Sequence, residues 1–586
     1  LPLALLFLTL LIGQNSETAM GQASPVKRGP RELAYVLEPF FGQGGPRFHI
    51  NLRFRGEPAG TTTLVLPNRW AGQQHLYRAI RNLRVSSPGA QLLGTSEPHT
   101  KVIRHAPNQE LRVSYELVQE GEGGPRGGHG TVYYRPIVRG EYFHWVGKVA
   151  WVHPAWDEEE AVRLSVRWEG LPRGWAVGNS FGVDRRRQRF VATVEEFKSA
   201  VFVGGDFRFA SVPVGGKPVY VALRGSWRFP DAAFADVIQR IVGAEREFWS
   251  DRDTPFYLVT LLTLEAPPGV THTGGSGLTN SFAAVATTNA GLDLFARLVA
   301  HEHFHNWNSQ QLGRLKEPEQ LLYWFSEGFT DYYANLLLLR GGLIGLDDYV
   351  RHYNEVISEY YLSPVRTESN RRVLEDFWDE PDVQKLPYQR GFLLAANWNA
   401  LIRSATGGRR SLDDMMHDML RAAREKRPLI TAELLGGHLS RYAGRDLLPD
   451  IRRYVENGET IIPDRNALGP HVELEMTEVR LFELGFDLET LRDKKVIAGV
   501  VAESAAHRAG LRDGQVVLRR LPIEVGNASK AVELTVKDGE AERTIRFYPA
   551  GRHTISMPQY RLRAGIGSRE RAENLRWLGV ASARGE

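Results

Sequence analysis

Cysteine is absent from the 586-residue chain. This absence excludes disulfide bonds, thiolate metal sites and cysteine nucleophiles, so any bound metal must be held by histidine and carboxylate side chains. A large excess of one charge is also missing, because 73 lysines and arginines stand against 69 acidic residues. The chain has no basic run with interleaved aromatic residues, and the sequence therefore does not favour nucleic acid as a partner.

Long hydrophobic runs are scarce. The one at the start, residues 1–13, is uncharged, but a membrane-spanning helix needs about 20 apolar residues, so we expect no integral membrane span. The run is typical of the apolar core of a secretory signal, and Gly21-Gln22-Ala23 is a suitable small-residue cleavage site. We predict that residues 1–23 are a signal segment and that the protein is secreted or periplasmic. A buried strand or helix is the alternative for this segment.

The spacing of the apolar residues changes along the chain. In the first third they alternate with polar residues, which predicts an antiparallel β-domain, and later they recur every three or four residues, which predicts helices. A turn-rich segment then leads to a second β-rich part. The predicted fold class is multidomain α+β, with an N-terminal β-domain over 32–205, a mainly helical domain over 206–465, a β-rich domain over 476–552 and a C-terminal tail over 553–586.

A histidine-rich helix carries the strongest motif of the sequence. His301, Glu302 and His305 form an H-E-x-x-H pattern, and residues four apart lie on one face of a helix, so both imidazoles can point at one metal ion. Glu302 is placed to take a proton from a water molecule. His303 points away from this face, and we expect it to be a packing or surface residue.

A third ligand follows in a second helical segment. Glu327 comes 22 residues after His305 in an aromatic-rich stretch. Two imidazoles and one carboxylate leave a fourth tetrahedral position open, which is typical of a catalytic rather than a structural zinc site. We predict one zinc ion per chain. Asp331, one turn later, can accept the second ring N–H of a ligand histidine, although an ordinary surface carboxylate is the alternative.

Three segments resemble the glycyl aminopeptidase family of gluzincin zinc metallopeptidases. They are HEHFHNWN at 301–308, WFSEGFTDYYANLLLLRGG at 324–342 and PYQRGFLLA at 387–395. The resemblance implies a thermolysin-like peptidase domain between an N-terminal β-domain and a C-terminal PDZ domain.

The resemblance also implies roles for single residues. The two histidines and the glutamate named above match the zinc ligands of the family, and Glu302 matches its general base. Tyr388 matches the tyrosine that donates a hydrogen bond to the oxyanion. The lysine that follows this tyrosine in the family is Arg390 here, which keeps the charge.

One departure from the family affects substrate binding. Aminopeptidases of this kind place a carboxylate in a glycine-rich edge strand, where it binds the free α-amine of the substrate. The corresponding stretch here contains Gly275, and Thr279 stands where the glutamate is expected. A hydroxyl cannot neutralise an ammonium group. Either another acid does so, with Glu265 the nearest upstream, or a free N-terminus is not required.

The last β-rich part resembles a PDZ domain. Leu484-Gly485-Phe486 is similar to the PDZ loop whose backbone N–H groups receive the carboxylate of a peptide C-terminus. The segment VVAESAAHRAGLRDGQVVLRR at 500–520 resembles the strand, helix and turn that follow in PDZ domains. We expect a C-terminal peptide as a possible ligand, and a PDZ fold that only packs is the alternative.

Together these features predict a secreted zinc-dependent metallopeptidase that acts on peptides or proteins. An aminopeptidase that releases small N-terminal residues such as Gly or Ala is the leading interpretation. A zinc endopeptidase that does not require a free N-terminus is the first alternative. The second is a catalytically idle binding protein, in which the β-domain and the PDZ domain are the working parts.

Overall fold

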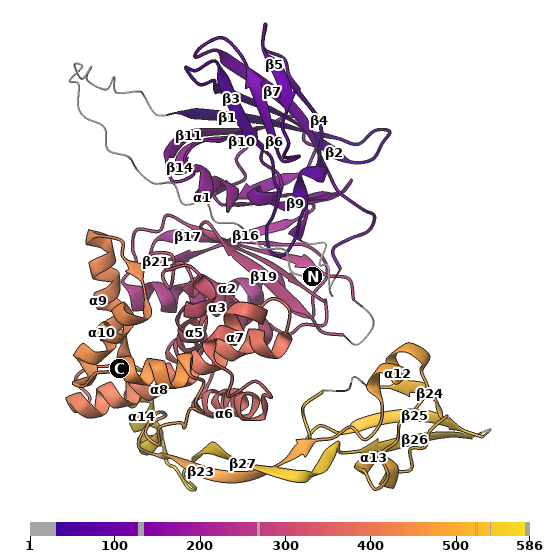
Figure 1. Ribbon diagram of the computed structural model, residues 1–586, viewed down its shortest axis with the longest axis vertical. Helices are drawn as coiled ribbons and strands as arrows, with labels where there is room; N and C mark the ends of the chain where they lie inside the picture. Colours follow the sequence, from indigo (N-terminus) through magenta and orange to yellow (C-terminus); the bar gives the residue numbers. More distant parts are fainter. Residues whose placement is uncertain are drawn as a thin grey trace, which may run out of the picture.

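The computed structural model describes residues 31–126, 134–266, 270–521, 523, 525–539 and 541–580. The predicted signal segment, residues 1–23, lies outside the described residues. The molecule consists of an N-terminal region (31–205), a helical region (206–471) and a terminal module (483–549) carried on a two-stranded ribbon (Figure 1). In the part of the chain that the structure describes, no helix is long and apolar enough to cross a membrane.

Three β-sheets build the N-terminal region. The largest has the strand order β14-β11-β1-β2-β7-β4 and is antiparallel except where β1 pairs with β11. The predicted alternation is confirmed in β2, where four side chains from Phe48 to Phe54 are buried and those between them face outward.

The elements of this region are β1 (Glu32–Phe40), β2 (Arg47–Arg55), β3 (Thr61–Val65), β4 (Ile80–Val85), β5 (Gln91–Gly94), β6 (Thr100–Arg104), β7 (Glu110–Val118), β8 (Ile137–Val138), β9 (Tyr142–Val146), β10 (His153–Pro154), β11 (Ala161–Trp168), β12 (Ala176–Asn179), β13 (Gly182–Val183), β14 (Arg187–Thr193), α1 (Val194–Lys198) and β15 (Val201–Gly205).

The third of these sheets, β13-β12-β15-β9-β8, packs against two cores. Alternate residues of a strand point to opposite faces. Phe143 and Trp145 of β9 therefore lie in the core of the N-terminal region, whereas Tyr142 and Val146 pack with residues of the helical region such as Leu258. This sheet joins the two regions through apolar contacts on both of its faces.

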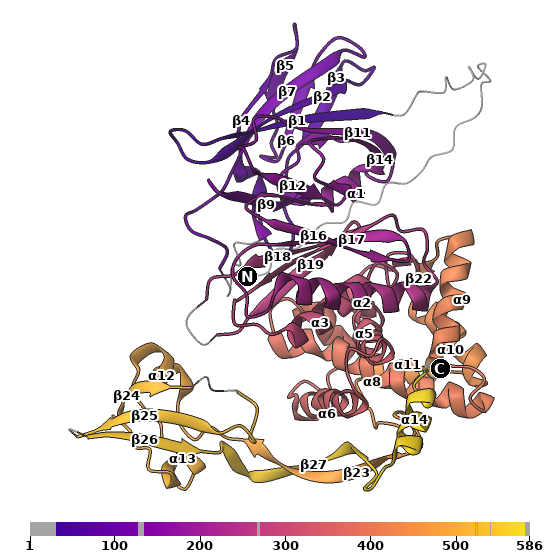
Figure 2. The same cartoon turned by 180° about the vertical axis from the view of Figure 1, so that it is seen from behind.

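A mixed sheet with the order β16-β17-β18-β20-β19 begins the helical region, and β19 is its edge strand. One face packs against the N-terminal region through Leu258 and Leu262 of β18. The opposite face, which carries Val259 and Leu261, is covered by α2 and α3 (Figure 2). The helix with the histidine motif thus packs against one face of this sheet.

The elements of the helical region are β16 (Arg208–Val214), β17 (Lys217–Leu223), α2 (Asp231–Trp249), β18 (Tyr257–Thr263), β19 (Thr273–Leu278), β20 (Ser281–Ala286), α3 (Leu292–Phe304), β21 (Arg314–Leu315), α4 (Tyr323–Ser326), α5 (Gly328–Arg340), α6 (Leu346–Leu362), α7 (Asn370–Asp376), α8 (Pro381–Thr406), α9 (Leu412–Glu425), β22 (Leu429–Ile430), α10 (Ala432–Ala443) and α11 (Leu448–Ile451).

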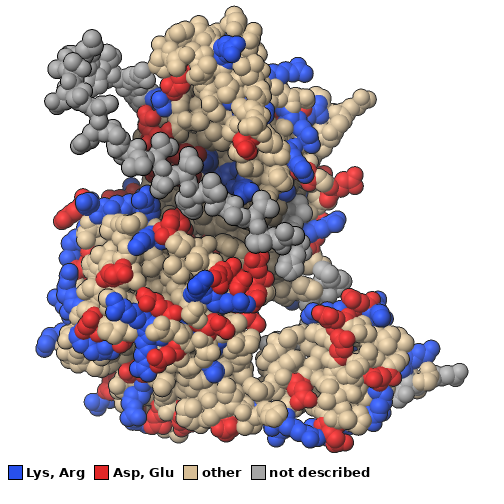
Figure 3. Space-filling model, viewed as in Figure 1, with Lys and Arg blue, Asp and Glu red and all other residues tan. Residues whose placement is uncertain are grey.

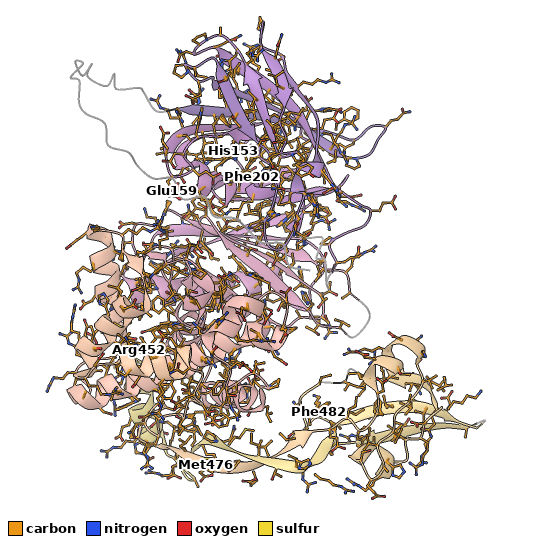
Figure 4. The ribbon with its side chains drawn as sticks, in the orientation of Figure 1. His153, Glu159, Phe202, Arg452, Met476 and Phe482 are labelled. Carbon is orange, nitrogen blue, oxygen red and sulfur yellow. The ribbon has the colours of Figure 1, made fainter. Side chains whose placement is uncertain are left out.

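The ribbon consists of β23 (Val472–Phe482) and β27 (Ala550–Leu562), which pair in antiparallel fashion along their length. Met476 lies midway along it with 64% of its surface exposed, and Phe482 lies where the ribbon meets the terminal module (Figure 4). The module contains α12 (Leu488–Lys494), α13 (Ala505–Arg508), β24 (Val516–Arg520), β25 (Val532–Asp538) and β26 (Ala541–Phe547) around a small apolar core.

The segment expected to be a C-terminal tail is packed instead. In β27, the backbone of Tyr560 exchanges two hydrogen bonds of 2.8 Å with the side chain of Asn354 on α6. The helix α14 (Ser568–Trp577) returns to the helical region, where buried Asn574 accepts a hydrogen bond from the backbone N–H of His471 at 2.9 Å. Local sequence does not indicate this, because β27 pairs with a strand that lies a whole module earlier in the chain.

Candidate active site

Helix α3 brings the H-E-x-x-H residues to one place. Its apolar face, with Phe295 and Val299, is buried against the sheet, and His301 lies on the last full turn. His305 follows the helix directly and keeps right-handed helical backbone angles. The two imidazoles therefore project from the same face, one turn apart.

Glu327 completes a triad with the two histidines. Nε2 of His301 and Nε2 of His305 lie 3.0 Å apart, and each lies 3.3 Å from Oε2 of Glu327. Zinc bound at about 2.0–2.1 Å in a tetrahedral site holds its ligand atoms about 3.3 Å apart. The triad therefore fits one zinc ion, and among the described residues it is the one group of three metal-ligating side chains close enough to share an ion.

Hydrogen bonds to the other ring nitrogens fix the orientation of both imidazoles. Nδ1 of His301 lies 2.7 Å from Oδ1 of Asp331, and Nδ1 of His305 lies 3.3 Å from the backbone oxygen of Asn308. A donor at Nδ1 leaves Nε2 as the lone-pair nitrogen that a metal needs. Both Nε2 atoms consequently face Glu327.

Asn308 is a residue of the site that sequence reasoning missed. Its buried amide nitrogen donates to the backbone oxygens of Phe325 and Ser326 at 3.1 and 3.3 Å and to Oγ1 of Thr330 at 3.0 Å. These bonds hold the turn between α4 and α5, where Glu327 sits. Nothing in the spacing of the motif indicates this role, because the partners are more than 15 residues away.

The charges of the triad are coupled. Burial alone would lower the pKa of His301, but the carboxylates of Asp331 and Glu327 outweigh it and raise that pKa. The pKa of His305 is raised in the same way, with burial opposed by Glu327. Burial pushes the pKa of Glu327 upward, yet the two imidazoles hold it well below its usual range. The arrangement favours positive charge between the three side chains.

The glycine-rich edge strand β19 lies beside Glu302. The backbone N–H of Gly277 donates to Oε2 of Glu302 at 2.9 Å, and a Cβ at this position would lie 3.0 Å from the same oxygen. At Gly275 a Cβ would approach the ring of Phe282 to 2.5 Å. A larger residue at Gly277 would press against Glu302 on α3, and one at Gly275 would press against Phe282 of the neighbouring strand β20.

A close helix crossing positions Tyr388. Gly391 on α8 meets α4 and α5 so closely that a Cβ there would lie 1.8 Å from the backbone oxygen of Trp324, and a Cβ at Gly328 would lie 2.4 Å from Cα of Gly391. Tyr388 stacks on His301 with 5.9 Å between ring centroids. Burial and then the nearby carboxylates raise the pKa of Tyr388 well above its ordinary value, so its hydroxyl stays a donor.

The structure does not bring Thr279 or Glu265 to the triad. Oγ1 of Thr279 donates to the backbone oxygen of Glu196 at 2.9 Å, so this side chain faces the N-terminal region. Glu265 is 59% exposed and forms an ion pair with Arg126 at 3.2 Å. Neither residue lines the cavity beside the triad, because each side chain is turned toward a partner in the N-terminal region.

Two other residues of the motifs are buried away from the cavity. His303 is 1% exposed on the opposite face of α3, where its Nδ1 lies 2.8 Å from Oε2 of Glu245. Arg390 is also buried and donates to the backbone oxygen of Arg366 at 3.0 Å. Both side chains hold neighbouring elements together and face away from the metal ligands.

A cavity of about 720 Å³ opens beside the triad. Its walls come from β19, α3, α5, α6 and α8, and Tyr134 of the N-terminal region completes the lining. Besides His301 and Glu302, the lining includes Gly275, Asp331 and Tyr388. One imidazole of the triad, the carboxylate of Glu302 and the phenol of Tyr388 thus meet at one cavity, where a small peptide has room.

The loop expected to bind a peptide C-terminus lies in the terminal module. Leu484 and Phe486 are buried in the core of the module, and Gly485 between them has a φ of 79°, which favours glycine. The backbone oxygen of Gly485 accepts a hydrogen bond from the N–H of Val501 at 2.9 Å. The loop belongs to the terminal module, which the ribbon of β23 and β27 joins to the helical region (Figure 1).

A family comparison supports the chemistry of this cavity. The model of the M61 glycyl aminopeptidase family matches residues 294–380, which include His301, His305 and Glu327. The resemblance predicted from the motifs is confirmed by this match, and the chain is a metallopeptidase. No curated protein matches the chain.

A solved structure has a similar fold. An aminopeptidase N family protein from Idiomarina loihiensis superimposes with a TM-score of 0.67 at 15% identity, over 93% of this chain and 100% of the other. An M1 zinc metallopeptidase from Deinococcus radiodurans gives a TM-score of 0.44 at 16% identity, over 74% of this chain and 94% of the other. The first of these shows that the whole multidomain architecture recurs.

Proposed function

We propose that the chain is a zinc aminopeptidase that releases small N-terminal residues from peptides. The observation that carries the proposal is the triad of His301, His305 and Glu327, whose ligand atoms lie 3.0–3.3 Å apart beside Glu302. We propose that these three side chains hold one zinc ion. When bound, zinc lowers the pKa of water and polarises the carbonyl of the scissile bond.

Glu302 is the proposed general base. Its Oε2 is fixed by the N–H of Gly277, so the carboxylate keeps one orientation toward the cavity. It accepts a proton from the attacking water and passes it to the nitrogen of the leaving amine. One carboxylate thus serves both halves of the reaction.

Tyr388 is the proposed donor to the oxyanion. Because burial keeps its hydroxyl protonated, it can donate a hydrogen bond to the oxygen on which negative charge develops. Such a donor acts mainly in the transition state. The ring is held against His301 by stacking, which keeps the hydroxyl at the cavity without a further movement.

The edge strand β19 supports a peptide as the substrate. Its outer side has no partner strand among the described residues, so its outward backbone groups, apart from the N–H of Gly277 that donates to Glu302, can pair with an extended peptide. Gly274 and Gly275 line the cavity and leave room for a main chain. We propose Gly275 as part of the substrate-binding strand.

A specific observation favours a second candidate function. The side chain of Thr279 is turned toward Glu196, and Glu265 is engaged by Arg126. Neither supplies a carboxylate for a substrate amine in this arrangement. A zinc endopeptidase that does not require a free N-terminus therefore remains the alternative to the aminopeptidase.

We also propose roles for the ends of the chain. The buried Leu484 and Phe486 and the left-handed Gly485 support a PDZ domain in the terminal module that binds a peptide C-terminus. The segment 1–23 is proposed as a secretory signal, which makes the protein secreted or periplasmic. An idle binding protein is disfavoured by the complete set of ligands, base and tyrosine.

Peptides that start with Gly, Ala or Leu, each free and N-acetylated, test these proposals. We expect hydrolysis of free Gly and Ala peptides that a chelator abolishes and added zinc restores. If N-acetylated peptides were cleaved as fast as the free peptides, the endopeptidase interpretation would be favoured over the aminopeptidase interpretation. If the zinc-loaded protein shows no cleavage that a chelator abolishes, the interpretation as a catalytically idle binding protein is favoured.

A further inference from the structure

An arginine lines the cavity one turn before the first metal ligand. Arg297 and His301 are four residues apart on α3 and therefore share a face, and both border the cavity of about 720 Å³. The guanidinium is half-buried, and its Nη1 donates to Oδ1 of Asn335 on α5 at 3.3 Å. The arginine is thus held in place by an amide rather than by an acid.

The charge of Arg297 has no counter-ion at contact distance among the described residues, where it takes part in no ion pair. Nearby arginines differ, since Arg351 pairs with Asp348 at 2.8 Å and with Glu355 at 2.9 Å. Over the helical region, basic and acidic side chains lie next to one another on the face seen in Figure 3. Arg297 is thus a half-buried guanidinium without an acidic partner at the cavity beside the triad.

Burial lowers the pKa of Arg297, and the negative charge of Glu355 opposes this shift only in part. A cation taken out of water without a partner is costly, and the cost is recovered when an anion enters the cavity. The guanidinium stays charged, because arginine has the highest pKa of the basic side chains.

Asn335 supplies a second donor at the same place. The side chain is 2% exposed and lines the cavity. Its oxygen is occupied by Arg297, whereas its Nδ2 is buried and has no hydrogen-bond partner in the part of the chain that the structure describes. A buried donor without an acceptor is unfavourable. The guanidinium of Arg297 and the Nδ2 group of Asn335 are therefore two neighbouring hydrogen-bond donors that can bind an acceptor in the cavity.

We propose that Arg297 and Asn335 form a subsite for a carboxylate of the substrate, on the leaving-group side of the scissile bond. The inference rests on the proposed peptidase function. The planar guanidinium matches a carboxylate in two parallel hydrogen bonds. The lining of the same cavity also includes the apolar side chains of Leu298, Ala334 and Phe392, which can contact short aliphatic groups around that carboxylate.

The spacing along α3 limits where the carboxylate lies. One helical turn is about 5.4 Å, and an extended peptide advances about 3.3–3.6 Å per residue. A carboxylate bound by Arg297 is then one or two residues from the carbonyl at the metal. Two sources have this chemistry, the C-terminal carboxylate of a dipeptide or tripeptide and an Asp or Glu side chain next to the scissile bond.

Matched peptides separate the two sources. Dialanine and trialanine are each compared as free acids and as C-terminal amides, and alanyl-glutamate amide is compared with alanyl-glutamine amide. We expect kcat/KM to be ~10–100-fold higher for at least one carboxylate form than for its neutral partner, the range of a charge-assisted hydrogen bond. Equal values in all three comparisons would overturn the subsite.

Variants assign the preference to this site. Arg297→Gln should bring the acid-to-amide ratio to about 1, and Arg297→Lys should keep part of it because the charge remains. Asn335→Asp should also remove the preference, since the new carboxylate pairs with Arg297. Arg351→Gln is the matched control, because it removes the same charge outside the cavity lining and should keep the ratio. An unchanged ratio in Arg297→Gln would overturn the assignment.

A binding measurement tests the carboxylate subsite independently of the proposed peptidase activity. Calorimetric titration of the zinc-loaded Glu302→Gln variant with dialanine and its amide needs no turnover, and the free acid should bind ~10–100-fold more tightly. If hydrolysis is absent but this difference is seen, the peptidase function fails and the subsite stands. If hydrolysis is present and the two ligands bind equally, only the subsite fails. Melting temperatures of each variant show whether it is folded.

Discussion

Two histidine–carboxylate pairs lie on opposite faces of α3, and they behave differently. His301 pairs with Asp331 at 2.7 Å on the cavity face, and His303 pairs with Glu245 at 2.8 Å on the buried face. The pKa of His301 is raised, whereas burial and the charge of Arg246 lower the pKa of His303 to about 3. Two residues along one helix are enough to reverse the shift.

The carboxylate makes the difference. Asp331 keeps 39% of its side-chain surface exposed and lies beside a second acid, Glu327, so negative charge is available to His301. Glu245 has 1% of its side chain exposed, and burial raises its pKa well above the ordinary value. The buried pair is therefore neutral and serves to dock α3 on α2. The two pairs are almost equal in length, so the burial of Glu245 and the added charge of Glu327 account for the opposite shifts of the two histidine pKa values.

The largest expected effect comes from removing the cavity-face histidines. A His301→Ala/His305→Ala double variant should lose zinc and lower peptide hydrolysis about 10³-fold or more, because both nitrogen ligands are gone. Elemental analysis of the dialysed protein measures the metal. The matched control is His303→Gln, which should retain zinc. Full zinc occupancy in the double variant would show that the triad is not the metal site.

Tyr388→Phe should have the next largest effect. The kcat for peptide hydrolysis should fall ~10²–10³-fold with little change in KM, because the lost hydrogen bond acts in the transition state. Steady-state kinetics measures both constants, and the zinc content should stay the same. A rise in KM at constant kcat would mean that the tyrosine binds the substrate and does not stabilise the transition state.

Breaking the buried pair should change stability and spare the metal. Glu245→Ala leaves Nδ1 of His303 without its partner and should lower the free energy of unfolding by about 1–3 kcal/mol. Glu245→Gln keeps a hydrogen-bonding group of the same size and should cost less. Denaturant unfolding followed by tryptophan fluorescence tests the order. If Glu245→Ala also loses zinc, the two faces of α3 are not independent.

The comparison can be extended to a third histidine, His144, which forms no pair with a carboxylate among the described residues. Burial lowers the pKa of His144 on β9 to about 4, and among the described residues neither ring nitrogen is hydrogen-bonded to another side chain. The unfolded chain binds a proton at this residue below about pH 6.5 and the folded chain does not until about pH 4, so stability falls as the pH drops through that window. The slope is about 1.4 kcal/mol per pH unit.

His144→Phe removes this titration and should flatten the dependence of the melting temperature on pH between 6.5 and 4. The phenyl ring is neutral at every pH and close in size to the imidazole. An identical pH dependence in the variant and the parent protein would show that other groups cause the loss of stability in acid.

The smallest effect on short peptides is expected from removing the terminal module, which touches neither face of α3. Phe482 and Ala550 pair at the end of the ribbon, so residues 483–549 can be replaced by an Asn-Gly turn that closes the hairpin. Hydrolysis of short peptides should stay within about twofold, and the melting temperature should change little. Aggregation of the shortened chain would show that the module is needed for folding.

The sequence predicts the parts of the site that depend on local spacing. His301 and His305 follow from helical periodicity, and Glu327 follows from its residue type and surroundings. Tyr388 came only from the family resemblance. Asn308, the contact between Gly328 and Gly391, and the pair of Arg297 with Asn335 could not be predicted, because each depends on where two separate helices meet.

The fold shows the same division. Alternation predicted the strands of the N-terminal region, and three- and four-residue spacing predicted the helices that follow. The parallel pairing of β1 with β11 and the return of β27 and α14 to the helical region were not predicted. Those contacts join segments far apart in the chain, and no local pattern records them.

The sheet that carries β9 and β15 has a consequence for how the chain folds during synthesis. Tyr142, Val146, Val201 and Val203 need the apolar side of β18 and β20 to be covered, and β20 ends only at Ala286. If the N-terminal region emerged from the ribosome before β18 and β20, one apolar face of this sheet would be exposed to water. We therefore expect the N-terminal region and the sheet of the helical region to fold as one cooperative unit and not one after the other.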